Sequence, residues 1–187
     1  MITEAKFKYA LKDLMHNNEL EDINVTLLCK KCGCHRQTFY YHYQDIYDLI
    51  ASILLNEDLT TFSNQTDLRK ALNTFLAYVE DNLEFLEKSY NSAARDLVDD
   101  FIYETVYKKI LKIIADNDKA VMKKPQIRTV CRRFAKILSN EYCACFKENY
   151  HVYDKFHKRM LKFNDCLIKI ILPSLIETSK KEDFSIL

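Results

Sequence analysis

Residues 24–49 read NVTLLCKKCGCHRQTFYYHYQDIYDL. This stretch holds the one glycine of the chain, Gly33, between two short segments with helical spacing of their apolar residues. Asn24 is placed to cap the first segment, which we expect to end near Cys32. A tight turn with a positive φ explains a glycine here, although an ordinary helix C-cap within a bundle is the alternative. The pattern predicts two short helices, the second over about 36–43.

Composition excludes the folds that depend on glycine. The chain has 187 residues with one glycine and two prolines, whereas average chains contain about 7% and 5% of these residues. Glycine-rich phosphate loops, β-sandwiches and barrels need many more turn residues. The sequence therefore predicts an almost wholly helical protein.

Helical spacing continues on both sides of residues 24–49. A first helix should end near His16, and Asp45 should cap a helix that reaches Thr60 or Phe62. Longer helices follow, and the last of them counts Ile170 among its apolar residues. The predicted fold is all-α, with short helices up to about residue 47 followed by a bundle of longer helices.

The second short helix has two different faces. At about 100° per residue, one arc of roughly 140° holds an arginine, a glutamine and two tyrosines: Arg36, Gln37, Tyr40 and Tyr41. Phe39 and Tyr43 lie toward the other side, where they can pack on the first helix. A tyrosine-rich helix that fills a core is the alternative, and it explains Phe39 and Tyr43 but not two adjacent polar residues.

The side chains of the polar arc can form hydrogen bonds to DNA bases and phosphates. Arg36 can donate two hydrogen bonds to guanine, and Gln37 can pair with adenine in the major groove. Three further residues have short polar tips suited to phosphate oxygens, namely Thr38, Tyr40 and His42. The helix is thus a candidate recognition helix.

Residues 24–49 resemble the helix-turn-helix signature of TetR-family (tetracycline-repressor-like) transcriptional regulators. RQTFYYHY followed by DIYDL is similar to the branch that contains the activator of the dihydroxyacetone kinase operon. The resemblance implies a three-helix DNA-binding domain over 1–47 and a helical effector-binding and dimerisation domain over 48–187. It also implies a homodimer on a near-palindromic operator in double-stranded DNA, controlled by a small-molecule effector or a protein partner.

The same resemblance assigns roles to single residues. It places Thr26 on the DNA backbone or a base edge, and Tyr41 on the backbone or a thymine methyl group. His35 stands where a small capping residue is usual, and it could itself reach a phosphate. The helix that starts at Ile46 would point its amino end at a phosphate. With the polar arc, the predicted DNA-binding set is Thr26, His35, Arg36, Gln37, Thr38, Tyr40, Tyr41 and His42.

Two features of residues 48–187 are candidates for effector or partner binding. Aromatic residues could line an effector cavity, although core packing is the more common use of such residues; the candidates are Tyr78, Phe101, Tyr103, Tyr107, Phe134 and Tyr142. Seven basic residues without an acid follow between positions 119 and 136: Lys119, Lys123, Lys124, Arg128, Arg132, Arg133 and Lys136. The basic run is typical of a solvated surface, and an anionic effector or acidic partner is the alternative.

Zinc binding is a weaker hypothesis. Cys29, Cys32, Cys34 and His35 have the spacing of a zinc cluster, but tetrahedral zinc needs four converging ligands. The resemblance implies small apolar side chains at the helix positions of Cys29 and Cys32, and buried cysteine behaves as a small hydrophobic residue. We therefore expect no metal and no cofactor.

The net charge and the remaining sequence motifs limit the classes of function that we expect. The net charge is +1, and residues 1–48 carry six Lys/Arg against seven Asp/Glu, so DNA binding requires Glu19, Glu21 and Asp22 to face away. The start MITEAKFKYA lacks the apolar core of a signal peptide, and the chain has no long apolar run. We therefore expect a cytoplasmic protein without membrane contact.

No catalytic arrangement is found, so an enzyme is not expected. The alternative function is a helical interaction module with vestigial DNA binding that acts through a partner protein.

Overall fold

A computed structural model describes residues 4–117, 125–147, 153–174 and 177. Every regular element in these ranges is a helix, which confirms the predicted all-α fold. The chain forms two compact units: unit one comprises Met1–Glu57 and Asn82–Phe101, and unit two comprises Asp58–Asp81 and Ile102–Leu187. In the described part of the chain, no helix combines the length and apolar character needed to cross a bilayer.

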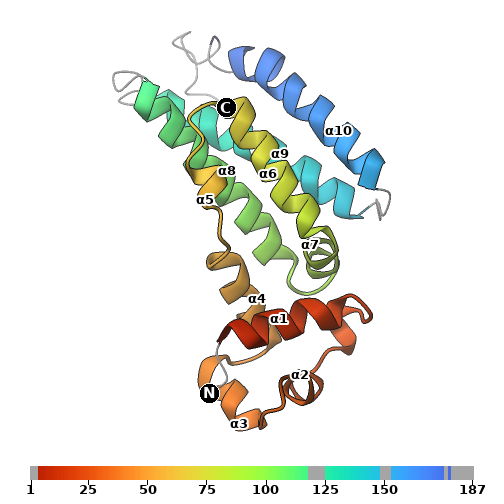
Figure 1. Ribbon diagram of the computed structural model, residues 1–187. Helices are drawn as coiled ribbons and strands as arrows, with labels where there is room; N and C mark the ends of the chain where they lie inside the picture. Colours follow the sequence, from red (N-terminus) through yellow and green to blue (C-terminus); the bar gives the residue numbers. More distant parts are fainter. Residues whose placement is uncertain (1–3, 118–124, 148–152, 175–176, 178–187) are drawn as a thin grey trace. The chain divides into compact units, whose positions relative to one another are not determined.

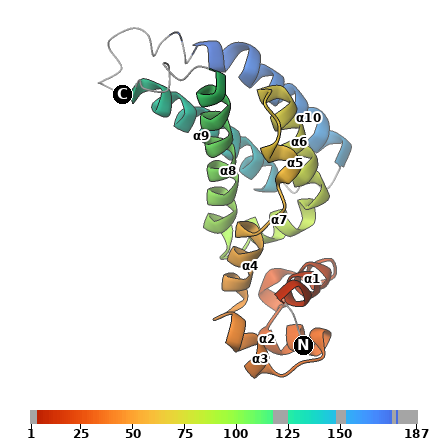
Figure 2. The ribbon, with the colours of Figure 1, turned by 60° about the vertical axis from the view of Figure 1, so that its left-hand side comes forward.

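Unit one is built around its first helix. Its elements are α1 (Glu4–Met15), the 3-10 turn η1 (Leu20–Asp22), α2 (Val25–Cys32), α3 (Arg36–His42), α4 (Ile46–Leu55), α7 (Leu83–Tyr90) and the start of α8 (Arg95–Asn117). Within this unit α1 packs on α2 and α4 (Figures 1 and 2). Its core contains Phe7, Leu11, Leu28, Phe39 and Leu49, all fully buried.

Local side chains set the helix starts in unit one. The Asn24 side chain accepts a hydrogen bond from the Leu27 amide at 2.9 Å, which confirms it as the cap of α2. Asp45 accepts from the Asp48 amide at 2.8 Å and caps α4 in the same way. Asp48 in turn accepts from the Gln44 amide at 3.0 Å, so the two aspartates satisfy amides that a helix start leaves open.

The helix that begins at Ile46 is shorter than the sequence predicts. It ends at Leu55, not at Thr60 or Phe62, and a separate short helix, α5 (Thr60–Ser63), follows. The Asp58 carboxylate accepts hydrogen bonds from both the amide and the hydroxyl of Thr60. Such local side-chain bonds compete with continued helix, and the apolar spacing across 56–59 does not reveal them.

Unit two is a bundle of longer helices. It contains α5, α6 (Leu68–Asp81), the rest of α8, α9 (Pro125–Lys147), α10 (Tyr153–Cys166) and the π-helix η3 (Leu167–Ile171). The long helix α10 lies along α6 (Figures 1 and 2). Buried aromatic rings from α6, α9 and α10 meet in the core, with Phe75 and Phe156 both packed on Tyr142.

Ile170, one of the apolar residues that the sequence places on the last helix, does not lie in the core. It is 62% exposed, whereas Leu167 at the start of the same turn is buried. The Leu172 amide bonds to the Leu167 carbonyl, so the turn is a π-turn that is wider than an α-helical one. Pro173 cannot donate a hydrogen bond to the preceding turn. The α-helical spacing of apolar residues therefore does not predict which residues are buried in this π-turn.

Candidate nucleic-acid interface

The turn between α2 and α3 depends on backbone conformation at one residue. Gly33 adopts φ 63° and ψ 42°, the left-handed region that favours glycine. The Cys34 amide bonds to the Cys29 carbonyl at 3.0 Å and the Gly33 amide to the Lys30 carbonyl at 3.2 Å, which is the pattern of a Schellman motif. A Cβ at Gly33 would meet no atom within 4 Å. The glycine is therefore needed for its φ angle and not for lack of space.

Aromatic packing fixes the inner face of α3 on α1. The Phe39 ring is fully buried and meets the Phe7 ring edge-on, with 5.4 Å between centroids. Tyr43 contacts the same two rings at 6.1 Å from Phe7 and 5.7 Å from Phe39. The prediction that Phe39 and Tyr43 face inward is confirmed.

The opposite face of α3 is open to solvent. Arg36 and Gln37 are exposed, Tyr40 is 49% exposed and Tyr41 is 86% exposed. The Arg36 guanidinium donates a 3.2 Å hydrogen bond to the Tyr40 hydroxyl and lies 5.8 Å from the centroid of that ring. This hydrogen bond raises the pKa of Arg36. The exposed face thus presents a permanent cation beside an amide and two phenolic rings.

Three other predicted DNA-binding residues lie on α2, on α3 and at the N-cap of α3. Thr26 is exposed near the start of α2, and Thr38 on α3 is half-buried. His35 is exposed at the N-cap position of α3, where its side chain makes no capping hydrogen bond. The missing cap bond fits a histidine in place of the usual small residue and leaves the ring free to reach outward.

His42 lies closer to α1 than the other candidates. It is half-buried, its ring centroid is 6.1 Å from that of Phe7, and its Nδ1 is 3.7 Å from the Glu4 carboxylate. A phosphate contact by His42 would compete with this carboxylate.

The start of α4 carries negative charge. Asp45 and Asp48 both accept backbone amides there. Two carboxylates beside these amides oppose the binding of a phosphate, although the resemblance assigns a phosphate to this helix end.

Several basic residues of unit one are engaged within the protein. Lys8 donates to the Ser52 carbonyl at 3.1 Å, Lys12 pairs with Glu57 at 2.7 Å, and Lys31 pairs with Asp13. Lys6 and Lys30 are exposed and form no ion pair among the described residues. Together with Arg36, they are cations of unit one that remain open to a polyanion; Arg95, whose Nε donates to the Tyr90 carbonyl, is also exposed.

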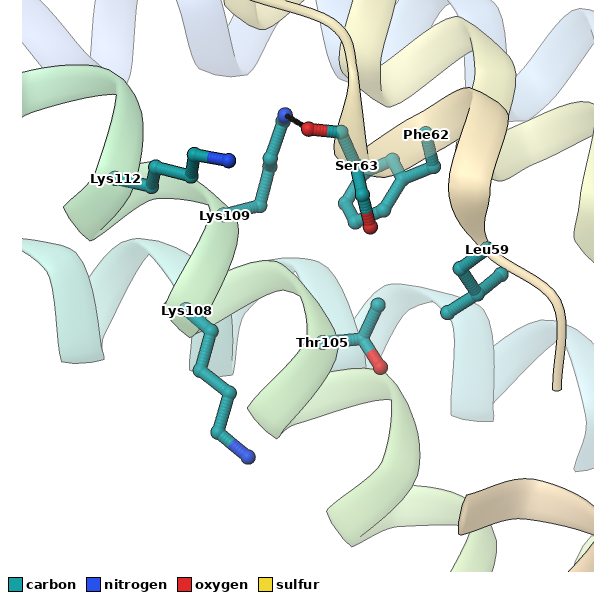
Figure 3. Close-up of a pocket in the computed structure, with 7 residues that line it drawn as sticks. All are labelled: Leu59, Phe62, Ser63, Thr105, Lys108, Lys109 and Lys112. Atoms are coloured by element: carbon teal, nitrogen blue, oxygen red, sulfur yellow. Dashed lines mark hydrogen bonds between the residues drawn. The ribbon is translucent and has the colours of Figure 1, made fainter. Parts of the chain in front are cut away.

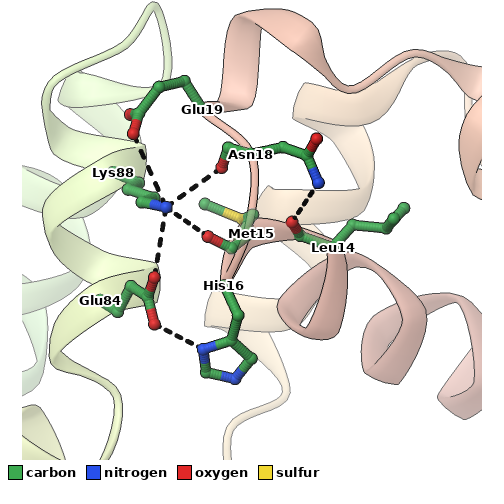
Figure 4. A network of polar contacts seen from close by, with 7 residues as sticks. All are labelled: Leu14, Met15, His16, Asn18, Glu19, Glu84 and Lys88. Carbon is green, nitrogen blue, oxygen red and sulfur yellow. Dashed lines mark hydrogen bonds and ion pairs between the residues drawn. The ribbon is translucent and has the colours of Figure 1, made fainter.

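A polar network joins α7 to the carboxyl end of α1. The Lys88 ammonium donates to the carbonyls of Met15 and Asn18 at 2.5 and 3.2 Å (Figure 4). It also pairs with Glu84 at 3.2 Å and with Glu19 at 3.6 Å. Glu19 therefore lies near the carboxyl end of α1, beside α7. Sequence reasoning missed this network because it predicted no separate helix over 83–90.

The Glu84 carboxylate is the acidic centre of the network. His16 Nδ1 lies 2.5 Å from it (Figure 4). Partial burial acts to raise the pKa of Glu84, but the hydrogen bonds from His16 and Lys88 outweigh burial and lower it. The folded protein therefore favours the ionised carboxylate.

The cysteines near the turn pack as small apolar side chains. Cys29 and Cys32 are buried, and their sulfur atoms lie 3.8 Å from the carbonyls of His35 and Lys6. Burial raises the pKa of Cys29 to about 11 and also raises the pKa of Cys32. Within the described ranges no three His, Cys, Asp or Glu side chains are grouped to hold a metal ion.

The six aromatic candidates for an effector cavity differ in burial and in the ring contacts that they make. Phe134 and Tyr142 are fully buried, and Tyr78 stacks on Phe75 with 6.1 Å between centroids. Tyr103 and Tyr107 stack on each other at 5.8 Å on α8. Phe101 belongs to unit one. Their role in ligand binding stays a prediction.

Part of the basic run is visible on α9. Arg128, Arg132 and Lys136 are exposed on this helix, and Lys136 lies 6.0 Å from the Tyr103 ring centroid. Exposure of all three agrees with a solvated surface. The other end of the run, Lys119, Lys123 and Lys124, lies outside the described residues.

Comparisons with known proteins give a relative in sequence and similar solved structures. No protein-family model matches the chain. Over 93 residues it is 28% identical to the HTH-type dhaKLM operon transcriptional activator DhaS of Lactococcus lactis subsp. lactis (strain IL1403). This match covers 48% of the chain and 50% of the relative, so the chain spans about half the length of that curated protein.

The structural comparison covers more of the chain. A solved structure of the dihydroxyacetone kinase operon activator DhaS matches with a TM-score of 0.65 at 23% identity, over 90% of this chain and 97% of that one. The chain is therefore homologous to a helix-turn-helix transcriptional activator and has the same all-helical fold.

Proposed function

We propose that the chain is a DNA-binding transcriptional regulator of the TetR-like type, with α3 as its recognition helix. One observation carries the proposal: α3 is fixed to α1 by Phe39 and Tyr43 while its other face exposes Arg36 and Gln37. A rigidly held helix with an exposed arginine–glutamine pair suits base reading in a major groove.

The named relatives support a regulatory and non-enzymatic role. Both are described as operon activators, which agrees with the branch that residues 36–49 resemble. In this proposal residues 1–47 bind DNA in the cytoplasm, with Thr26, His35 and Tyr41 flanking the base-reading pair. Residues 48–187 form the effector-binding and dimerisation domain.

A homodimer would place two recognition helices about one DNA turn apart, roughly 34 Å or somewhat more, on a near-palindromic operator. We assign dimerisation to the last two long helices, α9 and α10, packed as a four-helix bundle across a twofold axis. The exposed Ile170 just after α10 supports an apolar contact in this region. A small ligand or a protein partner acting on the bundle would shift the spacing and hence the affinity.

A second candidate is a helical interaction module with vestigial DNA binding. The observation that favours it is electrostatic, because Lys8, Lys12 and Lys31 are engaged within unit one and aspartates occupy the start of α4. DNA-binding domains usually present a clear basic surface. A partner protein would then carry the regulatory effect.

Fluorescence anisotropy separates the two candidates. Purified full-length protein is titrated into labelled DNA from around its own gene at several salt concentrations, with random DNA as competitor. The regulator predicts saturable binding that resists random DNA and weakens steeply as salt rises. Binding to no fragment in preference to random DNA, even at low salt, would favour the interaction module.

Asp48→Asn sharpens the electrostatic part of the proposal. Asparagine can still accept the Gln44 amide, so the change removes a charge and keeps the hydrogen bond. We expect DNA affinity to rise about twofold to fivefold at low salt, in line with roughly 0.3–1 kcal/mol for a charge at a helix terminus. Asp67→Asn is the matched control, since Asp67 likewise accepts an amide, that of Lys70, but lies in unit two. An equal gain in both variants would contradict a phosphate near α4.

A further inference from the structure

Unit two contains a pocket between α5 and α8 that the DNA-binding proposal does not use (Figure 3). Its volume is about 270 Å³, just below the usual range of roughly 300–1,000 Å³ for small-molecule sites. Leu59 and Phe62 supply apolar lining from the α5 side, and lysines of α8 supply positive charge. The pocket is amphipathic and suited to a small ligand.

Lys109 is the buried cation of the pocket. It is 5% exposed, and its ammonium donates to the Ser63 carbonyl at 2.8 Å and lies 5.5 Å from the Phe62 ring centroid. Ser63 is the one hydrogen-bond acceptor that this ammonium has in the described chain, although it carries three N–H groups. Burial and the neighbouring charge of Lys112 lower the pKa of Lys109, while Asp116 acts in the opposite direction.

Lys112 lies one helical turn further along α8. It is exposed and forms no hydrogen bond or ion pair within the ranges that the structure describes. Its side chain extends toward that of Lys109 (Figure 3). Lys108 differs, because it pairs with Glu104 at 3.3 Å and points away from the other two ammonium groups. Two of the three lysines therefore converge.

Capping of α5 explains only one of these lysines. A cation that binds the last carbonyl of a helix stabilises its carboxyl end, and Lys109 does this at Ser63. The same role gives no reason for Lys112 to extend toward a like charge, which costs electrostatic energy. An anion between the two ammonium groups would remove that cost.

We propose that the pocket binds a small phosphomonoester whose phosphate lies between Lys109 and Lys112 and whose apolar part packs on Leu59 and Phe62. A phosphate dianion balances two ammonium charges, whereas a monocarboxylate balances one. Phosphomonoester binding in this pocket does not depend on DNA recognition. Only the regulatory role of the pocket, as an effector site, rests on the proposed function.

Isothermal titration calorimetry with the full-length protein tests the site. The probe is phenyl phosphate at low ionic strength in a buffer free of phosphate, with phenol and inorganic phosphate as comparisons. We expect saturable binding of phenyl phosphate, weaker binding of inorganic phosphate and none of phenol. Absence of saturable phenyl phosphate binding, or equal binding of phenol, would overturn the proposal.

Two matched variants locate the binding. Lys112→Gln should weaken phenyl phosphate binding about tenfold, since one charge-assisted hydrogen bond is lost. Lys108→Gln removes the same charge from a side chain that points away, and it should change the affinity by less than about twofold. Equal losses in the two variants, with circular dichroism showing both folded, would overturn the site. No DNA is present, so failure of the operator experiment leaves this result unaffected.

Discussion

The two ends of α1 are held by different chemistry. Near its amino end the Phe7 ring meets Phe39 and Tyr43 of the α3 region, and all three rings are buried. At its carboxyl end the Met15 carbonyl and the His16 ring are held by Lys88 and Glu84 of α7. The first attachment consists mainly of buried aromatic rings, and the second is polar and partly exposed.

This difference predicts which of the two attachments weakens when pH or salt concentration changes. Aromatic burial gives a large free energy that depends little on pH or salt. Ion pairs at partly exposed sites give less free energy and respond to both. Helix α3 is therefore the firmly held neighbour of α1, and α7 is the adjustable one.

Phe39→Ala should produce the largest loss of folding stability. Removing a fully buried ring leaves a cavity between α1 and α3, so we expect the free energy of unfolding to fall by about 3–5 kcal/mol. Urea denaturation followed by circular dichroism measures it. Tyr41→Ala, on the same helix but 86% exposed, should change stability by less than about 0.5 kcal/mol. Similar losses in the two variants would refute the aromatic attachment.

Lys88→Met should produce an intermediate loss. Methionine keeps most of the apolar stem but leaves the carbonyls of Met15 and Asn18 without their ammonium donor. We expect about 1–3 kcal/mol of destabilisation, the range for unsatisfied groups at partly buried sites. The control Lys31→Met removes an exposed lysine that pairs with Asp13 and should cost less than about 0.5 kcal/mol. A Lys88 variant as stable as the control would mean that the Lys88 network does not stabilise the packing of α7 on α1.

Acid should produce the smallest effect, and Glu84 at the polar end allows it to be measured. The folded-state pKa of Glu84 is lowered from 4.5, so its stabilising contribution is fully present above about pH 4.5 and is lost as pH falls through the lower value. Because Glu84 is partly exposed, we expect less than about 1 kcal/mol. The difference in urea stability between wild type and Glu84→Gln should shrink from pH 7 to pH 3.5. An unchanged difference would exclude an ionic contribution.

The aromatic end of α1 could be predicted from sequence because its signals are local. The caps at Asn24 and Asp45 act over three residues, Gly33 is the only glycine, and the helical period places Phe39 and Tyr43 on one side. Each signal lies within one turn of the residue it affects. The predicted helix-turn-helix therefore matches the structure closely.

The polar end and the lysine pocket could not be predicted in this way. Glu84 meets His16 across 68 positions, and Lys109 meets the Ser63 carbonyl across 46. Both contacts need elements, α7 and α5, that apolar spacing did not separate from their neighbours. Long-range polar contacts leave no periodic pattern in the sequence, so only the folded chain brings these residues together.

The most direct test of the central claim is the effect of Arg36→Ala on specificity. Anisotropy gives the affinities of wild type and variant for the operator fragment and for random DNA at one salt concentration. If Arg36 reads a base, operator affinity should fall by about 1–3 kcal/mol while random-DNA affinity changes far less, so the ratio of the two falls. Equal losses on both DNAs, or no loss on either, would contradict base reading by α3.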